Sequence, residues 1–184
     1  MSRILYKYYV FLDTINSVIE NNLNKIKNIN IIVDVNYNNK ESLKKELSII
    51  DFAKKNKIPF ILKNNYQKCL KNKSDGILID SSNKRIIKPI LLKKKFTTIG
   101  IAHNQLEYLQ KKAQGCNLVM LSPLFYNEKY SINKILNVLK FNNKKINWDI
   151  DVGALGGINP KNIKKLKLLN ITKIGFKRFI LEVK

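Results

Sequence analysis

The sequence predicts an α/β protein, a small (β/α)8 TIM barrel with a truncated last helix. Apolar, β-rich runs alternate with amphipathic, Lys-rich runs along the chain, and about eight of the β-rich runs are nearly continuously apolar. Such runs are typical of a parallel sheet that is buried on both faces. With 184 residues, 45% of them hydrophobic, we expect a single domain over 1–184. A doubly wound open sheet is the alternative fold, although it would more naturally carry fewer strands.

The candidate strands are short runs rich in β-branched and aromatic residues. They cover Tyr8–Leu12, Asn30–Val35, Pro59–Leu62, Gly76–Asp80, Thr97–Ala102, Leu118–Ser122, Ile150–Leu155 and Lys173–Phe176. Between them, amphipathic helices are indicated where apolar residues recur three and four positions apart with Lys on the other face. These segments are Thr14–Lys27, Lys40–Asn56, Asn104–Gln114, Asn133–Phe141 and Pro160–Leu169. The links after Leu62 and Asp80 carry weaker helical patterns, and 179–184 is too short for a full helix.

The charge of the chain is strongly basic, with a formal net charge of +22, which raises nucleic acid and anionic membranes as partners. Of the 35 basic residues, however, only Arg3, Arg85 and Arg178 are arginine, and the lysines are spread along the chain. Proteins that read nucleic-acid grooves usually rely on the forked arginine side chain and gather their charge on one face. We therefore expect weak, salt-dependent binding to nucleic acid and no specific nucleic-acid partner.

Two isolated cysteines, Cys69 and Cys116, match neither a zinc-site spacing nor a disulfide framework, and they suit a reducing compartment. The segment Met1–Asp13 lacks the apolar length of a signal peptide, and no segment approaches the length of a membrane span. We expect a cytoplasmic protein without a membrane partner. The sequence leaves the oligomeric state open.

The most informative motif is the run 149–160, in which a strand leads into Gly156 and Gly157 and then into a helix start. Asn159 suits the N-cap, and Pro160 suits the first helical position. Glycines let the backbone approach a ligand closely, and the amides of a helix N-terminus favour phosphate. The alternative is a tight strand-to-helix turn that holds no ligand.

In a (β/α)8 barrel the functional site lies at the carboxyl ends of the strands, and phosphate often binds between the loops after strands seven and eight. Gly156 and Gly157 follow the seventh candidate strand, and Lys177 and Arg178 follow the eighth. A guanidinium group is a forked donor for phosphate oxygens. We expect these four residues to bind the phosphate of a substrate. The alternative for Lys177 and Arg178 is a pair of solvated charges.

Four segments resemble the thiamine-phosphate synthase and TenI superfamily, in the order in which that family carries them. Gly153–Pro160 resembles its ALGGI segment, and Ser74–Ile79 resembles its strand-four element ADGVHL. Ile99–Glu107 is similar to its strand-five segment, with a His before a helix, and Leu121–Phe125 is similar to its strand-six element. The resemblance covers nearly the whole chain, most weakly before Pro59. The family is a (β/α)8 barrel, in agreement with the strand count.

The resemblance implies a role in thiamine biosynthesis. The family's synthases are transferases that join hydroxymethylpyrimidine pyrophosphate to thiazole phosphate and release pyrophosphate with the help of Mg²⁺. A site of this kind needs oxygen ligands for the metal and cations for the leaving group, on which negative charge builds as the bond breaks. The implied partner is therefore a small phosphorylated heterocycle.

The family's two metal-binding Asp positions read Asn65 and Asn83 in this chain. An amide oxygen can ligate Mg²⁺ but brings no charge, so we expect weakened Mg²⁺ binding and leave the metal ligands unassigned. By their positions at neighbouring strand ends, Asp34, Asp80 and Glu128 could supply replacement carboxylates.

The resemblance leaves the catalytic group unassigned and marks a set of candidate substrate-site residues. These are Asn65, Asn83, His103, Ser122, Asn127 and Lys129. His103 is the only histidine and could act as a general acid or base, although we favour a structural hydrogen bond at the helix start. The tautomerase branch of the superfamily carries a His where this chain has Pro123. A divergent thiamine-phosphate synthase is our first hypothesis, and a noncatalytic or tautomerase-like barrel that binds a thiamine-pathway phosphate is the alternative.

Overall fold

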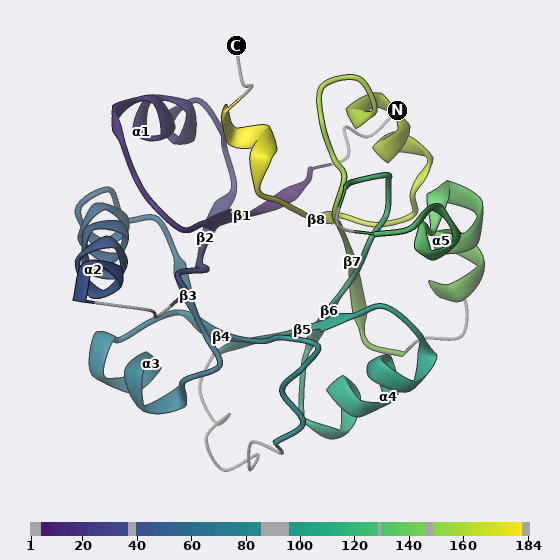
Figure 1. Ribbon diagram of the computed structural model, residues 1–184, viewed down its shortest axis with the longest axis horizontal. Helices are drawn as coiled ribbons and strands as arrows, with labels where there is room; N and C mark the ends of the chain where they lie inside the picture. The colour runs from purple at the N-terminus through teal and green to yellow at the C-terminus, as the bar shows by residue number, and fades with distance from the viewer. Residues whose placement is uncertain (1–4, 37–39, 86–95, 129, 146–148, 182–184) are drawn as a thin grey trace.

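Eight parallel strands close into a barrel in the order β1 to β8, and β8 pairs with β1 (Figure 1). The structure is a computed structural model that describes residues 5–36, 40–85, 96–128, 130–145 and 149–181. The prediction of a (β/α)8 barrel is confirmed, and the open-sheet alternative is wrong. Helices α1 to α5 surround the closed sheet (Figure 1).

The observed strands lie within one or two residues of the predicted runs. They are β1 (Lys7–Leu12), β2 (Ile29–Val33), β3 (Phe60–Lys63), β4 (Gly76–Ile79), β5 (Thr97–Ala102), β6 (Leu118–Leu121), β7 (Asp151–Leu155) and β8 (Lys173–Phe176). The α-helices are α1 (Ser17–Asn24), α2 (Lys40–Lys55), α3 (Tyr66–Asn72), α4 (Gln105–Ala113) and α5 (Asn137–Lys145). The described residues also form short 3₁₀ helices, η2 (Ile132–Lys134), η3 (Ile163–Leu168) and η4 (Arg178–Leu181).

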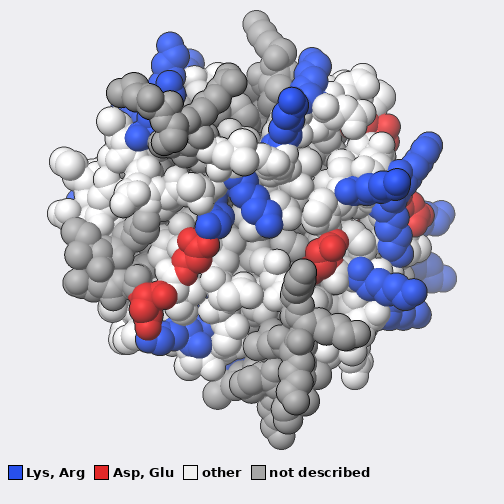
Figure 2. Space-filling model, turned by 180° about the vertical axis from the view of Figure 1, so that it is seen from behind, with Lys and Arg blue, Asp and Glu red and all other residues white. Residues whose placement is uncertain are grey.

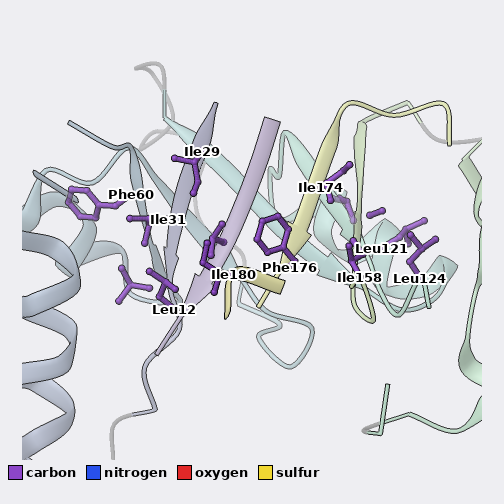
Figure 3. Packing of buried hydrophobic residues seen from close by; sticks show 14 of the residues in the cluster. Leu12, Ile29, Ile31, Phe60, Leu121, Leu124, Ile158, Ile174, Phe176 and Ile180 are labelled. Atoms are coloured by element: carbon purple, nitrogen blue, oxygen red, sulfur yellow. The ribbon is translucent and has the colours of Figure 1, made fainter. Parts of the chain in front are cut away.

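Two apolar layers hold the barrel together because the side chains of a strand alternate between the two faces of the sheet. The inner layer fills the barrel and consists of Tyr9, Phe11, Ile32, Ile61, Leu78, Ile99, Leu118 and Met120. The larger, outer cluster includes alternate strand residues, such as Val10 and Ile31, together with apolar residues of the helices. Figure 3 shows part of this outer cluster.

Asparagine side chains cap the starts of α1, α3 and α4, and Asn137 makes a bond of the same kind with the Lys140 amide, at 3.1 Å, at the start of α5. Asn16, Asn65 and Asn104 each accept a hydrogen bond from the backbone amide three residues later, at 2.9 to 3.0 Å. These bonds satisfy amides that the first turn of a helix leaves without partners. The frequent Asn residues of this sequence therefore help to fix where the helices begin.

Two predicted helices differ from the structure. The segment Asn133–Phe141 divides into η2 and α5, and the segment Pro160–Leu169 contains only the 3₁₀ helix η3. In the second case the side-chain oxygen of Asn159 accepts hydrogen bonds from the amides of Lys161 (2.9 Å) and Asn162 (3.2 Å). These are the bonds of a helix N-cap, as predicted for Asn159. The chain then continues as turns and the 3₁₀ helix η3, so the predicted α-helix over this segment is wrong.

The last helical element is short, as predicted. Among the described residues it is the 3₁₀ helix η4, whose carbonyl at Ile180 accepts a hydrogen bond from Asn22 of α1 at 2.8 Å. Ile180 is buried, and Figure 3 shows it near Leu12 of β1 and Phe176 of β8. This packing ties the segment after β8 to the barrel wall and to α1.

A buried lysine fixes the loop that follows β4. Lys111 of α4 is fully buried, and its ammonium group donates hydrogen bonds to the carbonyls of Asp80 and Asn83 and to the side chain of Gln114. Burial lowers the pKa of Lys111 because an apolar environment disfavours the charged form. The three acceptors satisfy the donors of this buried group and hold the loop in one position.

The basic side chains do not form a single patch on the face shown in Figure 2. Lys and Arg are distributed over several parts of this face, with acidic side chains among them. No helix in the described part of the chain is both long and apolar enough to span a bilayer. Cys69 and Cys116 are both buried with free thiols.

We expect Ile32→Ala to destabilise the protein by about 2–5 kcal/mol, because the substitution leaves a cavity in the inner layer. Ile132→Ala is the matched control: this side chain is 74% exposed, so the change should stay within about 0.5 kcal/mol. The free energies come from urea unfolding. Equal effects of the two substitutions would contradict the assignment of Ile32 to the core.

Lys111→Met should lower the free energy of unfolding by about 1–3 kcal/mol, because it leaves buried carbonyl groups without donors. Lys112→Met removes the neighbouring, half-exposed lysine and should have an effect near zero. Hydrogen exchange in the segment 80–85 should accelerate only in the Lys111 variant. Unchanged stability and exchange would show that Lys111 does not anchor the loop.

Candidate functional site

Polar side chains follow the inner apolar layer at the carboxyl ends of most strands. Each lies two residues after an inner apolar residue, and the set comprises Asp13, Asp34, Lys63, Asp80, His103 and Ser122. Because side chains alternate with a period of two, these positions continue the inward-facing rows to the rim of the barrel. The carboxyl rim is therefore polar where the barrel interior is apolar.

Four of these residues and Lys177, which follows β8, form a chain of ion pairs, which we call the rim network: Asp13, Lys177, Asp34, Lys63 and Asp80. Lys177 contacts Asp13 at 2.9 Å and Asp34 at 3.4 Å. Lys63 contacts Asp34 at 3.0 Å and Asp80 at 3.7 Å. The network thus connects the ends of β8, β1, β2, β3 and β4.

The charged states of the rim network are mutually reinforcing. Burial alone would raise the pKa of Asp13, but its hydrogen bond with Lys177 holds that pKa below the ordinary value. Burial alone would lower the pKa of Lys177, but the hydrogen bond to Asp13 and the charge of Asp34 raise it. Both groups are therefore ionised at neutral pH.

The carboxylate of Asp80 accepts three hydrogen bonds at the rim. One of its oxygens accepts hydrogen bonds from the Ser82 hydroxyl (2.7 Å) and the Asn83 amide (2.9 Å). The other accepts from the side-chain amide of Asn64 at 2.7 Å. Burial raises the pKa of Asp80, but these donors and Lys63 outweigh that effect and lower it below its ordinary value.

A cavity of about 810 Å³ opens beside the rim network, between the ends of β1, β7 and β8 and the loop after β6. Its lining combines apolar residues with polar groups. The residues relevant to ligand binding are Asp13, Asn127, Glu128, Gly156, Gly157, Ile158, Lys177 and Arg178. All four residues predicted to bind phosphate therefore line one cavity.

The turn after β7 presents backbone donors to this cavity. Among the described residues, the amides of Gly157 and Ile158 have no hydrogen-bond acceptor. The carbonyl of Gly157 accepts a bond from the side chain of Asn162 at 2.7 Å, which fixes the peptide at this point. Two unpaired amides in a fixed turn are suited to an anionic ligand.

Gly157 has a second, structural role. Its φ is +73°, and a Cβ atom there would lie 2.3 Å from the carbonyl oxygen of Phe125 and 2.7 Å from that of Tyr126. The loop after β6 lies directly against this turn, where the Phe125 amide donates to the Gly156 carbonyl at 3.1 Å. Only glycine fits this approach.

The two cations predicted to bind phosphate are both paired with carboxylates. Lys177 belongs to the rim network, and the Arg178 guanidinium lies 3.6 Å from the Glu128 carboxylate. Arg178 is 69% exposed, so this contact is weak and solvent-screened. Arg178 can exchange its carboxylate partner for a ligand at small cost.

The two asparagines at the family's metal-binding positions have different surroundings. The side-chain oxygen of Asn65 caps α3 by accepting from the Lys68 amide at 3.0 Å, which commits it to the helix start. Asn83 donates to the side-chain oxygen of Asn64 at 3.2 Å, and Asn64 in turn donates to Asp80. Asn64, rather than Asn65, reaches the rim network.

His103 has the structural hydrogen bond favoured above. Its Nδ1 lies 2.7 Å from the carbonyl oxygen of Ser122, and because a carbonyl can only accept, Nδ1 carries the proton. The backbone amide of His103 donates to the Glu107 carboxylate at 2.8 Å. The His103 ring also lies near that of Tyr130, with centroids 5.4 Å apart, so it is held from three sides.

The remaining predicted residues lie as follows. Ser122 is buried at the end of β6, Asn127 lines the cavity, and Lys129 lies outside the described residues. Sequence reasoning missed Asp13, Lys63 and Asn64. The period of two that starts at Phe11 and Ile61 would have placed Asp13 and Lys63 at the rim.

The curated proteins that match this chain in sequence are thiamine-phosphate synthases. A thiamine-phosphate synthase from Prochlorococcus marinus subsp. pastoris is 28% identical over 140 residues, which cover 74% of this chain and 39% of that protein. A thiamine-phosphate synthase from another Prochlorococcus marinus strain is 30% identical over 77 residues, 41% of this chain and 22% of that protein. The chain thus matches less than half the length of these curated relatives. No protein-family model matches it.

Solved structures share the fold at low sequence identity. A thiamine phosphate pyrophosphorylase from Pyrococcus furiosus superimposes with a TM-score of 0.72 at 14% identity, over 96% of this chain and 91% of that one. The protein of the same name from Bacteroides thetaiotaomicron gives a TM-score of 0.61 at 13% identity, over 97% and 93%. FabK from Thermotoga maritima gives 0.67 at 12% identity, over 96% and 60%, so the barrel alone does not define an activity.

The closed barrel, the order of the four sequence motifs and the identity of the curated relatives agree with one another. Together they support a resemblance to the thiamine-phosphate synthase/TenI-like superfamily.

Proposed function

We propose that this chain joins hydroxymethylpyrimidine pyrophosphate to thiazole phosphate and releases pyrophosphate, as a divergent thiamine-phosphate synthase. The observation that carries the proposal is the cavity at the carboxyl rim, where the unpaired amides of Gly157 and Ile158 lie in the same lining as Lys177 and Arg178. The curated relatives are named thiamine-phosphate synthases, which supports this activity.

The phosphate of the thiazole substrate would bind in this cavity. The amides of Gly157 and Ile158 would donate to its oxygens, and Arg178 would leave Glu128 to contact it as a forked donor. The bond between the pyrimidine substrate and its pyrophosphate breaks as the bond to the thiazole forms, so negative charge builds on the leaving group. The ammonium groups of Lys177 and Lys63, which the rim carboxylates hold in place, would be the positive charges that face this leaving group.

A noncatalytic barrel that binds a thiamine-pathway phosphate is the second candidate. Two observations favour it: Asn65 and Asn83, at the family's metal-binding positions, bring no charge, and both lysines of the rim network are shared between two carboxylates. The two candidates differ in turnover but share the phosphate site.

Purified protein supplied with both precursors should form thiamine phosphate and an equal amount of pyrophosphate. Parallel reactions contain Mg²⁺ or a chelator, and both products are quantified by chromatography. Tight binding of thiamine phosphate without any product would favour the noncatalytic barrel instead. Neither binding nor turnover would contradict both candidates.

Arg178→Gln should weaken the affinity for thiazole phosphate by about ten- to a hundredfold, because it removes a charge-assisted hydrogen bond worth about 1.5–3 kcal/mol. Glu128→Gln should tighten binding, since it frees Arg178 from its carboxylate. Arg85→Gln, at the other arginine in the described residues, is the charge-matched control and should leave the affinity unchanged.

Calorimetry with each variant measures these affinities. Equal affinity of wild type and Arg178→Gln would show that the phosphate does not bind at the end of β8. A valine at Gly157 is a poor test, because the clash with the Phe125 and Tyr126 carbonyls would destabilise the turn even without a ligand.

A further inference from the structure

The ammonium group of Lys63 lies between two carboxylates that come from the neighbouring strands. It contacts Asp34, after β2, at 3.0 Å and Asp80, after β4, at 3.7 Å. All three side chains are largely shielded, with 22%, 27% and 19% of Asp34, Lys63 and Asp80 exposed. An ion pair in such a place is screened by solvent much less than a surface pair.

A divalent cation would need the same oxygen atoms. Mg²⁺ binds through one or two carboxylates at about 2.0–2.1 Å in octahedral geometry and keeps several waters. A carboxylate offers about four lone-pair positions, and Asp80 uses three of them for Ser82, the Asn83 amide and Asn64. The Lys63 ammonium group faces the same carboxylate at 3.7 Å. Both oxygens of Asp34 contact lysines, one with Lys63 and the other with Lys177. The rim as built does not fit a metal ion.

The charge balance leads to the same conclusion. The rim network contains three carboxylates and two ammonium groups, so it has one net negative charge. The family's metal-binding carboxylates would have added two more negative charges at positions 65 and 83, where this chain has Asn. Asp80 is instead held by N–H donors: the side-chain amide of Asn64 donates to it directly, and that of Asn83 donates to Asn64. No group of three or more metal-ligating side chains occurs among the described residues.

We propose that Lys63 takes the place of a divalent cation between Asp34 and Asp80, so that the positive charge of this rim comes from an amino acid and not from a metal. Two further residues agree with this role: Asn65 and Asn83 stand where the family carries metal-binding Asp residues and bring no negative charge, while Lys63 supplies a cation. Any contact of Lys63 with the diphosphate of a substrate rests on the proposed function. The claim that Lys63 excludes a metal ion from the rim does not depend on that function.

Lys63→Met should uncover a divalent-cation site. The substitution keeps the length of the side chain and removes the ammonium group, so Asp34 and Asp80 would gain lone pairs that a metal can use. Mn²⁺, counted as free ion by electron paramagnetic resonance up to about 1 mM, is the probe. We expect the variant to bind Mn²⁺ at least about tenfold more tightly than the wild type.

Three controls isolate the charge of Lys63. Lys63→Arg retains the cation and should bind no more Mn²⁺ than the wild type. Lys112→Met removes a lysine paired with Asp149, away from the rim network, and should also show no gain. Adding Asp80→Asn to Lys63→Met should abolish the gained site. Circular dichroism confirms that each variant is folded.

Two results would overturn the inference. The first is a wild-type protein that binds Mn²⁺ at the rim, recognised because Asp80→Asn removes the binding, since Lys63 would then move aside for the metal. This result is decisive even if Lys63→Met does not fold. The second is a folded Lys63→Met variant with no gain in Mn²⁺ binding. Failure of the turnover experiment would leave both measurements meaningful, so the two proposals fail separately.

Discussion

The pairing of β8 with β1 is the constraint on which the site depends. The register runs from Lys7 beside Lys173 to Val10 beside Phe176, and it closes the parallel sheet. Because every strand runs in the same direction, this closure brings all eight carboxyl ends to one rim. Lys177 consequently reaches Asp13 and Asp34, although most of the chain separates them in sequence.

The barrel separates stability from chemistry along each strand. Inner residues such as Ile61 and Leu78 fill the barrel. Two positions later along the same strands, the inward-facing residues are Lys63 and Asp80 at the rim. The polar groups of the rim can be partly buried because they satisfy one another through ion pairs and hydrogen bonds. Gly157 likewise has a structural and a functional role. One backbone conformation lets the loop after β6 pack closely and leaves two amides unpaired for a ligand.

Most of the fold could be predicted from the sequence, and the reasons are local. Continuous apolar runs marked the strands, and apolar residues three and four positions apart marked most of the helices. The caps at Asn16, Asn65 and Asn104, seen in the structure, are also bonds made within four residues. The prediction of an α-helix after Pro160 was wrong, because the segment after the Asn159 cap continues as turns and a 3₁₀ helix, a difference that periodicity does not reveal.

The candidate site was predicted less completely, since it depends on contacts between distant segments. The motif at Gly156 and Gly157 pointed to the cavity, and Lys177 and Arg178 line it. Nothing in the composition distinguishes Lys63 from the many solvated lysines; its contacts with Asp34 and Asp80 do. Choosing between Asn64 and Asn65 likewise required knowing that Asn65 caps α3.

The central claim is that the turn after β7 and the end of β8 together bind a phosphate. The most direct measurement is a titration of ¹⁵N-labelled protein with thiazole phosphate, followed by the backbone amide resonances. The account predicts that the amides of Gly157 and Ile158 shift most, together with those of Lys177 and Arg178. Largest shifts at the amino ends of the strands, or none at Gly157 and Ile158 at saturation, would contradict it.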